Sequence, residues 1–192
     1  MSNNPVQNPK KPNPQGKGLV PFLQDWQSMQ PEVVEPTAAA DFLRDYAFSS
    51  LVLAAEFRFK PVPEKSYYLY STPTGWRLSL IAPQELGRHN FGEFLARCQL
   101  GRDMTWEVVA DDIVKDSPAA LRAQSFVLGF LQTLSEQASI ADSLPTYVAQ
   151  LPYYRRLLAT GLSSRLASCL PALGGEVRQL LAHNQAAISL LE

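Results

Sequence analysis

The fold is decided by residues 67–81, which read Tyr67-Tyr68-Leu69-Tyr70-Ser71-Thr72-Pro73-Thr74-Gly75-Trp76-Arg77-Leu78-Ser79-Leu80-Ile81. The first four residues are aromatic or aliphatic, the next five are typical of turns, and the last six alternate between apolar and polar types. In that alternation Trp76, Leu78 and Leu80 point to one face, and Arg77 and Ser79 to the other. The pattern predicts an antiparallel β-hairpin with one apolar face.

An isolated two-stranded hairpin is only marginally stable in water, so its apolar face must be covered. The preceding residues 37–57 can supply the cover, because their apolar residues recur at helical spacings from Phe42 to Ala54. Thr37 is the candidate N-cap of this helix. Upstream, the apolar stretch 19–26 is expected to dock on the folded body.

Downstream of the hairpin, Asn90 and Glu93 have the spacing of a capping box, which predicts a short amphipathic helix up to Cys98, closed by Gly101. Residues 103–109 suggest a further short strand.

From Asp116 onward the pattern is helical, with Ser117 as N-cap and Pro118 at the first helical position. One face of this helix is expected to be apolar. Its members are Val127, Phe130, Leu131, Leu134 and Ala138. We expect helix breakers to divide the remainder into short helices, the last over 176–191. These breakers are Pro152, Gly161, Pro171 and the Gly174-Gly175 pair.

The predicted fold class is therefore α+β: a small antiparallel β-hairpin or sheet packed on helices, followed by an all-helical C-terminal bundle. We predict a flexible tail over residues 1–18, an α+β domain over 19–112 and a helical bundle over 113–192. The tail prediction rests on composition, because this stretch offers almost no apolar surface to bury.

Composition excludes several functional classes. The chain has 192 residues, 46% of them hydrophobic, and a net charge of −1, so no global basic field attracts nucleic acid or anionic lipid. No apolar run reaches the length of a membrane helix. The two cysteines, Cys98 and Cys169, and the two histidines, His89 and His183, match no zinc spacing. We expect buried thiols, a reducing cytoplasmic location, and no bound metal.

A resemblance to a known family rests on several separated motifs. These motifs are Asn13-Pro14-Gln15-Gly16-Lys17-Gly18-Leu19-Val20-Pro21, Tyr67-Tyr68-Leu69-Tyr70, Leu80-Ile81-Ala82-Pro83 with Gly87, Phe94-Leu95, and Asp103-Met104-Thr105-Trp106. Together they resemble the domain-of-unknown-function family 2452, which has small bacterial members and a human open-reading-frame product. The resemblance covers about residues 13–110. It implies no activity and no catalytic residues, because the family has no established activity.

The sequence contains no nucleophile elbow, no Walker phosphate loop and no zinc-protease helix motif. Gly16-Lys17-Gly18 lacks the spacing of a phosphate loop, and Asp111-Asp112 is better interpreted as a solvated turn than as paired catalytic carboxylates. We therefore name no catalytic residue and no cofactor, and we lean against an enzyme.

One local group is suggestive of binding: the turn that carries Arg88 and His89, with Tyr70, Arg77 and Trp106 as neighbours. Neither Arg88 nor His89 is a residue that a core would select, and an arginine beside aromatic surface suits a carboxylate or a phosphate. We predict a binding site from these five residues.

Two classes of function stay open. The first is a non-enzymatic protein-interaction module, with an unknown protein partner or with self-association through the sparsely charged C-terminal helices. The alternative is a small ligand-binding domain or an enzyme acting on an anionic small molecule through the Arg77, Arg88 and His89 region. A concave pocket with convergent polar groups would favour the second class, and an exposed apolar surface the first.

Overall fold

The sheet of this protein has four antiparallel strands in the order β2-β1-β3-β4. The computed structural model describes residues 24–25, 38–87, 91–109, 117–137, 139–144 and 151–182. The predicted tail over 1–18 lies outside these residues. The strands are β1 (Ser66–Thr72), β2 (Gly75–Ser79), β3 (Glu93–Leu100) and β4 (Trp106–Val108). The helices are α2 (Ala39–Ala54), α3 (Pro118–Glu136) and α4 (Tyr153–Ala182), with short 3-10 turns η1 (Pro83–Glu85) and η3 (Ala141–Ser143).

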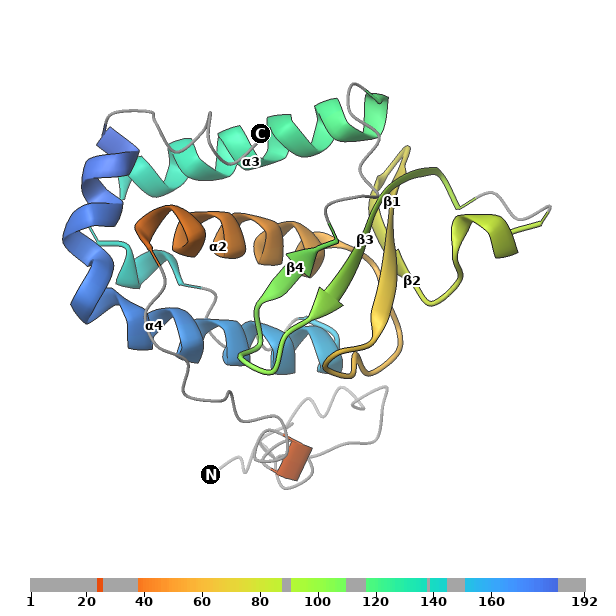
Figure 1. Cartoon of the computed structure of the whole chain (residues 1–192), viewed down its shortest axis with the longest axis horizontal. Coiled ribbons are helices and arrows are strands. Elements are labelled where there is room, and N and C mark those ends of the chain that lie inside the picture. The colour runs from red at the N-terminus through yellow and green to blue at the C-terminus, as the bar shows by residue number, and fades with distance from the viewer. Residues whose placement is uncertain are drawn as a thin grey trace, which may run out of the picture.

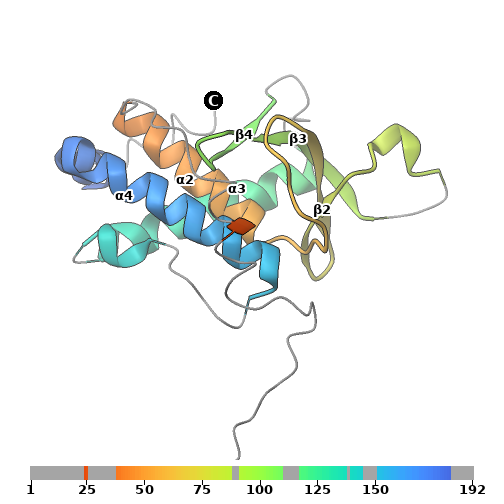
Figure 2. The ribbon, with the colours of Figure 1, turned by 90° about the horizontal axis from the view of Figure 1, so that it is seen from below.

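The α+β prediction is confirmed, and α2, α3 and α4 lie on one side of the sheet (Figures 1 and 2). The hairpin at 67–81 is also present, with Leu69 opposite Leu78 and Tyr70 opposite Arg77. Trp76 and Leu78 are buried, as their alternation predicts. Leu80 is 46% exposed instead, because β2 ends at Ser79 and the alternation stops there.

The short helix predicted up to Cys98 is wrong, since Glu93–Leu100 is strand β3 and pairs with β1. The register shifts between Leu69 and Tyr70: Leu69 pairs with Ala96, but Tyr70 pairs with Phe94. Leu95 is therefore an extra residue, and both it and Ala96 are buried. Such a β-bulge interrupts the strict alternation of a strand. The interrupted spacing resembles that of a helix, and long-range pairing with β1 overrides it.

Helix α2 forms within the predicted range 37–57, but it begins after Ala38, whose side chain makes no capping hydrogen bond. The proposed cap Thr37 lies outside the described residues. Of the stretch 19–26, only residues 24 and 25 are described, and Asp25 accepts hydrogen bonds from Lys60 Nζ at 2.9 Å and from the Tyr153 hydroxyl at 2.7 Å.

Helix α3 begins as predicted. The Ser117 hydroxyl accepts a hydrogen bond from the Ala120 amide at 3.0 Å, and Pro118 is the first helical residue. Of the predicted inner face, Leu131 and Leu134 are buried, Val127 and Phe130 are partly buried, and Ala138 lies outside the described residues.

The division of the C-terminal region into short helices is wrong, because α4 is one helix of 30 residues that contains Gly161, Pro171 and the Gly174-Gly175 pair. Its buried side chains run from Tyr153 to Leu181, so packing holds the helix together across the breakers. Figure 1 shows the helix changing direction in its C-terminal part. A proline inside the helix explains such a bend.

Two hydrophobic clusters meet along α2. The first joins the C-terminal half of α2 to the sheet and to the beginnings of α3 and α4. Its α2 members are Leu51 and Val52, with Ala119 from α3 and Leu157 from α4. The second joins the N-terminal half of α2 to the later parts of α3 and α4, and includes Phe42, Leu43, Tyr46, Leu134 and Leu166. The predicted boundary between 19–112 and 113–192 therefore does not separate two cores.

The turn between β3 and β4 approaches α4 closely at Gly161. A Cβ atom added to Gly161 would lie 2.8 Å from Met104 Cε and 3.2 Å from Met104 Cβ. Gly129 in α3 is a contrasting case, because an added Cβ would meet nothing within 4 Å.

We predict opposite effects at these two glycines. Gly161→Val should lower the free energy of unfolding by about 2 kcal/mol through overpacking against Met104. Gly129→Ala should raise it by about 0.5–1 kcal/mol, because glycine is a poor residue in an exposed helix. Urea unfolding of both variants measures the difference. A Gly161→Val chain as stable as the wild type would mean that Met104 does not hold α4 at this distance.

Candidate functional site

Tyr70 and Arg77, two of the predicted site residues, face each other across β1 and β2 on the side of the sheet turned away from the helices. The Tyr70 hydroxyl donates a hydrogen bond to the Ile81 carbonyl at 2.8 Å, and burial raises the pKa of Tyr70 to about 12. Arg77 is exposed, and its guanidinium carbon lies 5.3 Å from the ring centroid of Phe91. Phe91 and Phe94 pack against Tyr70, so phenylalanines supply the aromatic surface here.

Arg88 and His89 lie outside the described residues, so their grouping with Tyr70 and Arg77 stays a prediction.

Trp106 does not join this group. It stands in β4, at the opposite edge of the sheet from β2, and its side chain is 1% exposed on the face covered by helices. Its ring meets that of Tyr67 edge-on at 5.5 Å, and its amide donates a hydrogen bond to Ser49 Oγ at 2.9 Å. The prediction that Trp106 lies near Arg77 is wrong, because it requires β4 to lie beside the hairpin. Strand β3 takes that position instead.

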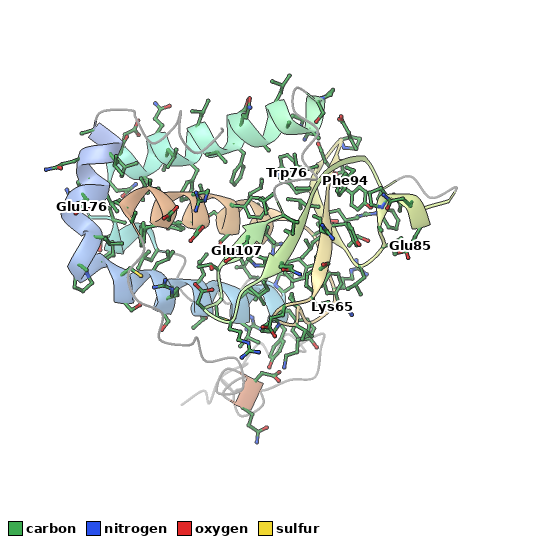
Figure 3. All side chains as sticks on the ribbon, viewed as in Figure 1. Lys65, Trp76, Glu85, Phe94, Glu107 and Glu176 are labelled. Atoms are coloured by element: carbon green, nitrogen blue, oxygen red, sulfur yellow. The ribbon has the colours of Figure 1, made fainter. Side chains whose placement is uncertain are left out.

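A groove lies on the other face of the hairpin, where β2 meets the first turns of α3. It has a volume of about 380 Å³ and is lined by Trp76, Leu121, Arg122, Ser125 and Phe126. We call it the α3 groove. Figure 3 labels Trp76 at this end of the sheet, beneath α3. The exposed fraction of Leu121 is 53%, and that of Leu128, two turns further along α3, is 45%.

Arg122 joins α3 to the hairpin. Its Nη1 donates to Ser71 Oγ at 2.6 Å and to the Thr72 carbonyl at 2.7 Å. The guanidinium carbon lies 5.5 Å from the Trp76 ring centroid, within cation–π range. No carboxylate among the described residues forms an ion pair with Arg122. As far as the described residues go, the groove therefore combines one unpaired guanidinium with an apolar floor.

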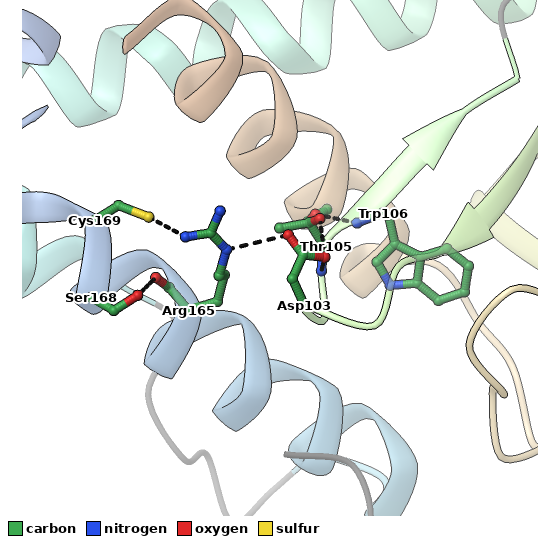
Figure 4. Close-up of polar contacts among 7 residues, drawn as sticks. Asp103, Thr105, Trp106, Arg165, Ser168 and Cys169 are labelled. Atoms are coloured by element: carbon green, nitrogen blue, oxygen red, sulfur yellow. Dashed lines mark hydrogen bonds and ion pairs between the residues drawn. The ribbon is translucent and has the colours of Figure 1, made fainter. Parts of the chain in front are cut away.

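A second polar cluster is structural (Figure 4). Arg165 is 5% exposed; its Nε donates to Asp103 Oδ2 at 3.2 Å, and its Nη1 also contacts Cys169 Sγ. The other Asp103 oxygen accepts from the Thr105 hydroxyl at 2.7 Å and from the Thr105 amide at 3.2 Å. A charge pair whose carboxylate accepts further hydrogen bonds is suited to holding a turn in place, and this one links the β3–β4 turn to α4.

The two cysteines are buried free thiols, as predicted. Burial raises the pKa of Cys98 to about 12, which keeps it protonated at neutral pH. Within the described ranges, no group of three or more His, Cys, Asp or Glu residues could hold a metal ion.

Asp45 in α2 lies near Asp103, the acid of the Arg165–Asp103 ion pair, and near two further carboxylates. Desolvation raises the pKa of Asp45 from 3.8 to about 6; Arg44 opposes the shift, and Asp103, Glu107 and Asp41 add to it. Because the folded chain holds this proton more tightly than the unfolded chain, ionisation of Asp45 destabilises the fold. The cost is absent below about pH 4 and complete above about pH 6.

Asp45→Asn should therefore raise the free energy of unfolding at pH 7.5 by about 1–2 kcal/mol and leave it nearly unchanged at pH 4. The gain is smaller than the full pKa shift implies, because the Asp45 side chain is partly exposed to solvent. Urea unfolding at pH 4, 6 and 7.5 measures the trend. An equal gain at all three pH values would place the effect in the side chain's packing and not in its charge.

Arg122, Ser125 and Leu121 are site residues that were not predicted from the sequence. One signal was available: Leu121 and Leu128 are spaced by seven and lie off the face formed by Val127, Phe130, Leu131 and Leu134. Both leucines are exposed, and self-association through the C-terminal helices stays a prediction.

No family model matches the chain, and neither a curated protein nor a solved structure matches it. The resemblance of residues 13–110 to family 2452 therefore stays a prediction. Among the described helices, none combines the length and the apolar character needed to cross a membrane.

Proposed function

We propose that this protein is a non-enzymatic protein-interaction module that binds its partner on the α3 groove and the adjoining leucines. The observation that carries the proposal is the exposure of Leu121 and Leu128 on one face of α3, beside a groove floored by Trp76 and Phe126. Exposed helix faces of soluble proteins are normally polar. Exposed apolar side chains next to a groove are typical of sites where a peptide or a helix docks.

The chemistry of the groove favours binding over catalysis. None of the five described lining residues is a His, Cys, Asp or Glu, so this part of the lining offers no general base. The one hydroxyl among these five residues is that of Ser125, which donates to the Leu121 carbonyl of its own helix at 2.9 Å. A serine used in this way lacks the partner that would activate it as a nucleophile.

The alternative function is a ligand-binding domain or an enzyme that acts on an anionic small molecule through Arg77, Arg88 and His89. One observation favours it: Arg77 is exposed over Phe91, and no carboxylate in the described part of the chain pairs with it. A thermal-shift screen of anionic metabolites with wild type and Arg77→Gln separates the two candidates. A shift that disappears in Arg77→Gln would support the alternative.

The proposal includes a cytoplasmic setting, in keeping with two buried, unpaired thiols. It also includes self-association as one form of the interaction. Sedimentation of the full chain at high micromolar concentration decides between a second copy of the chain and a different protein as the occupant of the leucine face.

We predict that the double variant Leu121→Ser/Leu128→Ser loses the partner recovered by affinity pull-down from native cell extract. Its stability should change by less than about 0.5 kcal/mol, because both side chains are largely exposed. The matched control is Val62→Ser/Leu80→Ser, which removes apolar residues of 51% and 46% exposure elsewhere on the surface. If the α3 variant keeps every partner and the control loses one, the binding surface lies elsewhere.

A further inference from the structure

We infer that the α3 groove recognises an acidic segment of a partner protein, in which an Asp or Glu carboxylate pairs with Arg122 and an adjacent apolar side chain rests on Trp76 and Phe126. This inference rests on the proposed function and adds the chemistry of the partner. It is carried by the geometry of Arg122 and by the charge of the groove.

The Arg122 guanidinium is held in place before any partner binds. A guanidinium has five N–H donors, two of them on Nη1. Both Nη1 hydrogens are used, one by Ser71 Oγ at 2.6 Å and one by the Thr72 carbonyl at 2.7 Å. Because the group is planar, these two bonds and the contact with the Trp76 ring fix its orientation.

The opposite edge of the same guanidinium is left for a ligand. Nε and Nη2 of Arg122 make no hydrogen bond to the described residues. Together they form the fork that accepts a carboxylate side-on through two parallel hydrogen bonds. Arg122 is an exposed residue, so this fork does not need to be uncovered by a large rearrangement.

The charge of the groove specifies an anion. Among the described residues of the lining there is one guanidinium and no acidic side chain, so a partner carboxylate would meet no repulsion from them and would neutralise the Arg122 charge. We favour a carboxylate over a phosphate, because phosphate-recognising sites for modified peptides usually gather several basic side chains, whereas this groove offers one.

The other lining residues indicate which type of side chain lies next to the acidic residue of the partner. Trp76 is 9% exposed and forms part of the aromatic floor, and Leu121 adds an aliphatic rim. A volume of about 380 Å³ is at the small end of ligand pockets. The groove therefore has room for one or two side chains of a peptide and not for the edge of a folded domain. Because the space is this small, the apolar residue of the peptide should be directly next to the acidic residue in sequence.

The first experiment selects short random peptides, displayed on phage, on the immobilised full-length chain. Enriched peptides that share an Asp or Glu next to an apolar residue are the expected result. Enrichment of peptides without an acidic residue would overturn this inference and leave the proposed function standing. If no peptide is enriched over a blank surface, this inference fails, and the pull-down with the leucine variant decides the proposed function by itself.

The second experiment measures the affinity of the most enriched peptide by fluorescence anisotropy. Arg122→Gln should weaken binding roughly tenfold or more, and so should replacement of the peptide's Asp by Asn or its Glu by Gln. Combined, the two changes should weaken binding no further than either alone, because each removes the same ion pair. Additive losses would contradict a direct contact between the two groups.

Three controls keep this result interpretable. Arg122→Lys retains the charge but not the fork, and should bind with intermediate affinity. Arg58→Gln removes an exposed arginine from the segment before β1, and should bind like the wild type. The substituted peptide is tested on the unaltered chain, so the inference can fail even if Arg122→Gln loses stability along with its bonds to Ser71 and Thr72.

Discussion

Burial of α2 along its whole length is the constraint on which the rest of the structure depends. Its C-terminal half packs on the sheet through Leu51 and Val52, and its N-terminal half packs on α3 and α4 through Phe42, Leu43 and Tyr46. A single helix thus contributes to both hydrophobic clusters. Neither cluster can be completed without α3 and α4, because each of these helices also contributes to both. The sheet and the C-terminal helices are therefore tied together through one shared element.

The packing of α3 on both hydrophobic clusters explains why its outer face is exposed. Helix α3 turns Ala119, Ala123 and Phe126 toward the sheet cluster and Leu131 and Leu134 toward the helical cluster. Its inner face is fully occupied by this double contact, so Leu121 and Leu128 must point outward. At the same end, Arg122 bridges to the hairpin through Ser71 and Thr72 and forms one wall of the groove. The proposed binding surface is thus a consequence of the way α3 is anchored.

Local pattern was sufficient where one residue or one alternation determines the structure. The hairpin followed from its turn residues and its period of two, and the start of α3 from Ser117 and Pro118. Pattern failed where distant contacts decide. In β3, the bulge at Leu95 gives the apolar residues a spacing like that of a helix. In α4, packing along the helix outweighs the helix-breaking tendency of Pro171. Both failures come from pairing or burial that no local window contains.

The candidate site was predicted less well than the fold, for a related reason. The order β2-β1-β3-β4 brings Tyr70 and Arg77 together but places Trp106 at the far edge, and strand order cannot be read from a single sequence. Arg122 and Trp76 are 46 positions apart in the chain and meet only because α3 crosses the end of the hairpin. Of the candidate site, only the seven-residue spacing of Leu121 and Leu128 on α3 could be recognised from the sequence.

We propose that partners bind on the α3 side of the hairpin and not on the face that carries Arg77. Site-specific photo-crosslinking distinguishes the two faces, with a photoreactive amino acid placed at Ser125 in the groove or at Gln84 in η1, beside the opposite face. In native extract, the account predicts a crosslinked partner from position 125 and none from position 84. A partner captured from position 84 alone would contradict it.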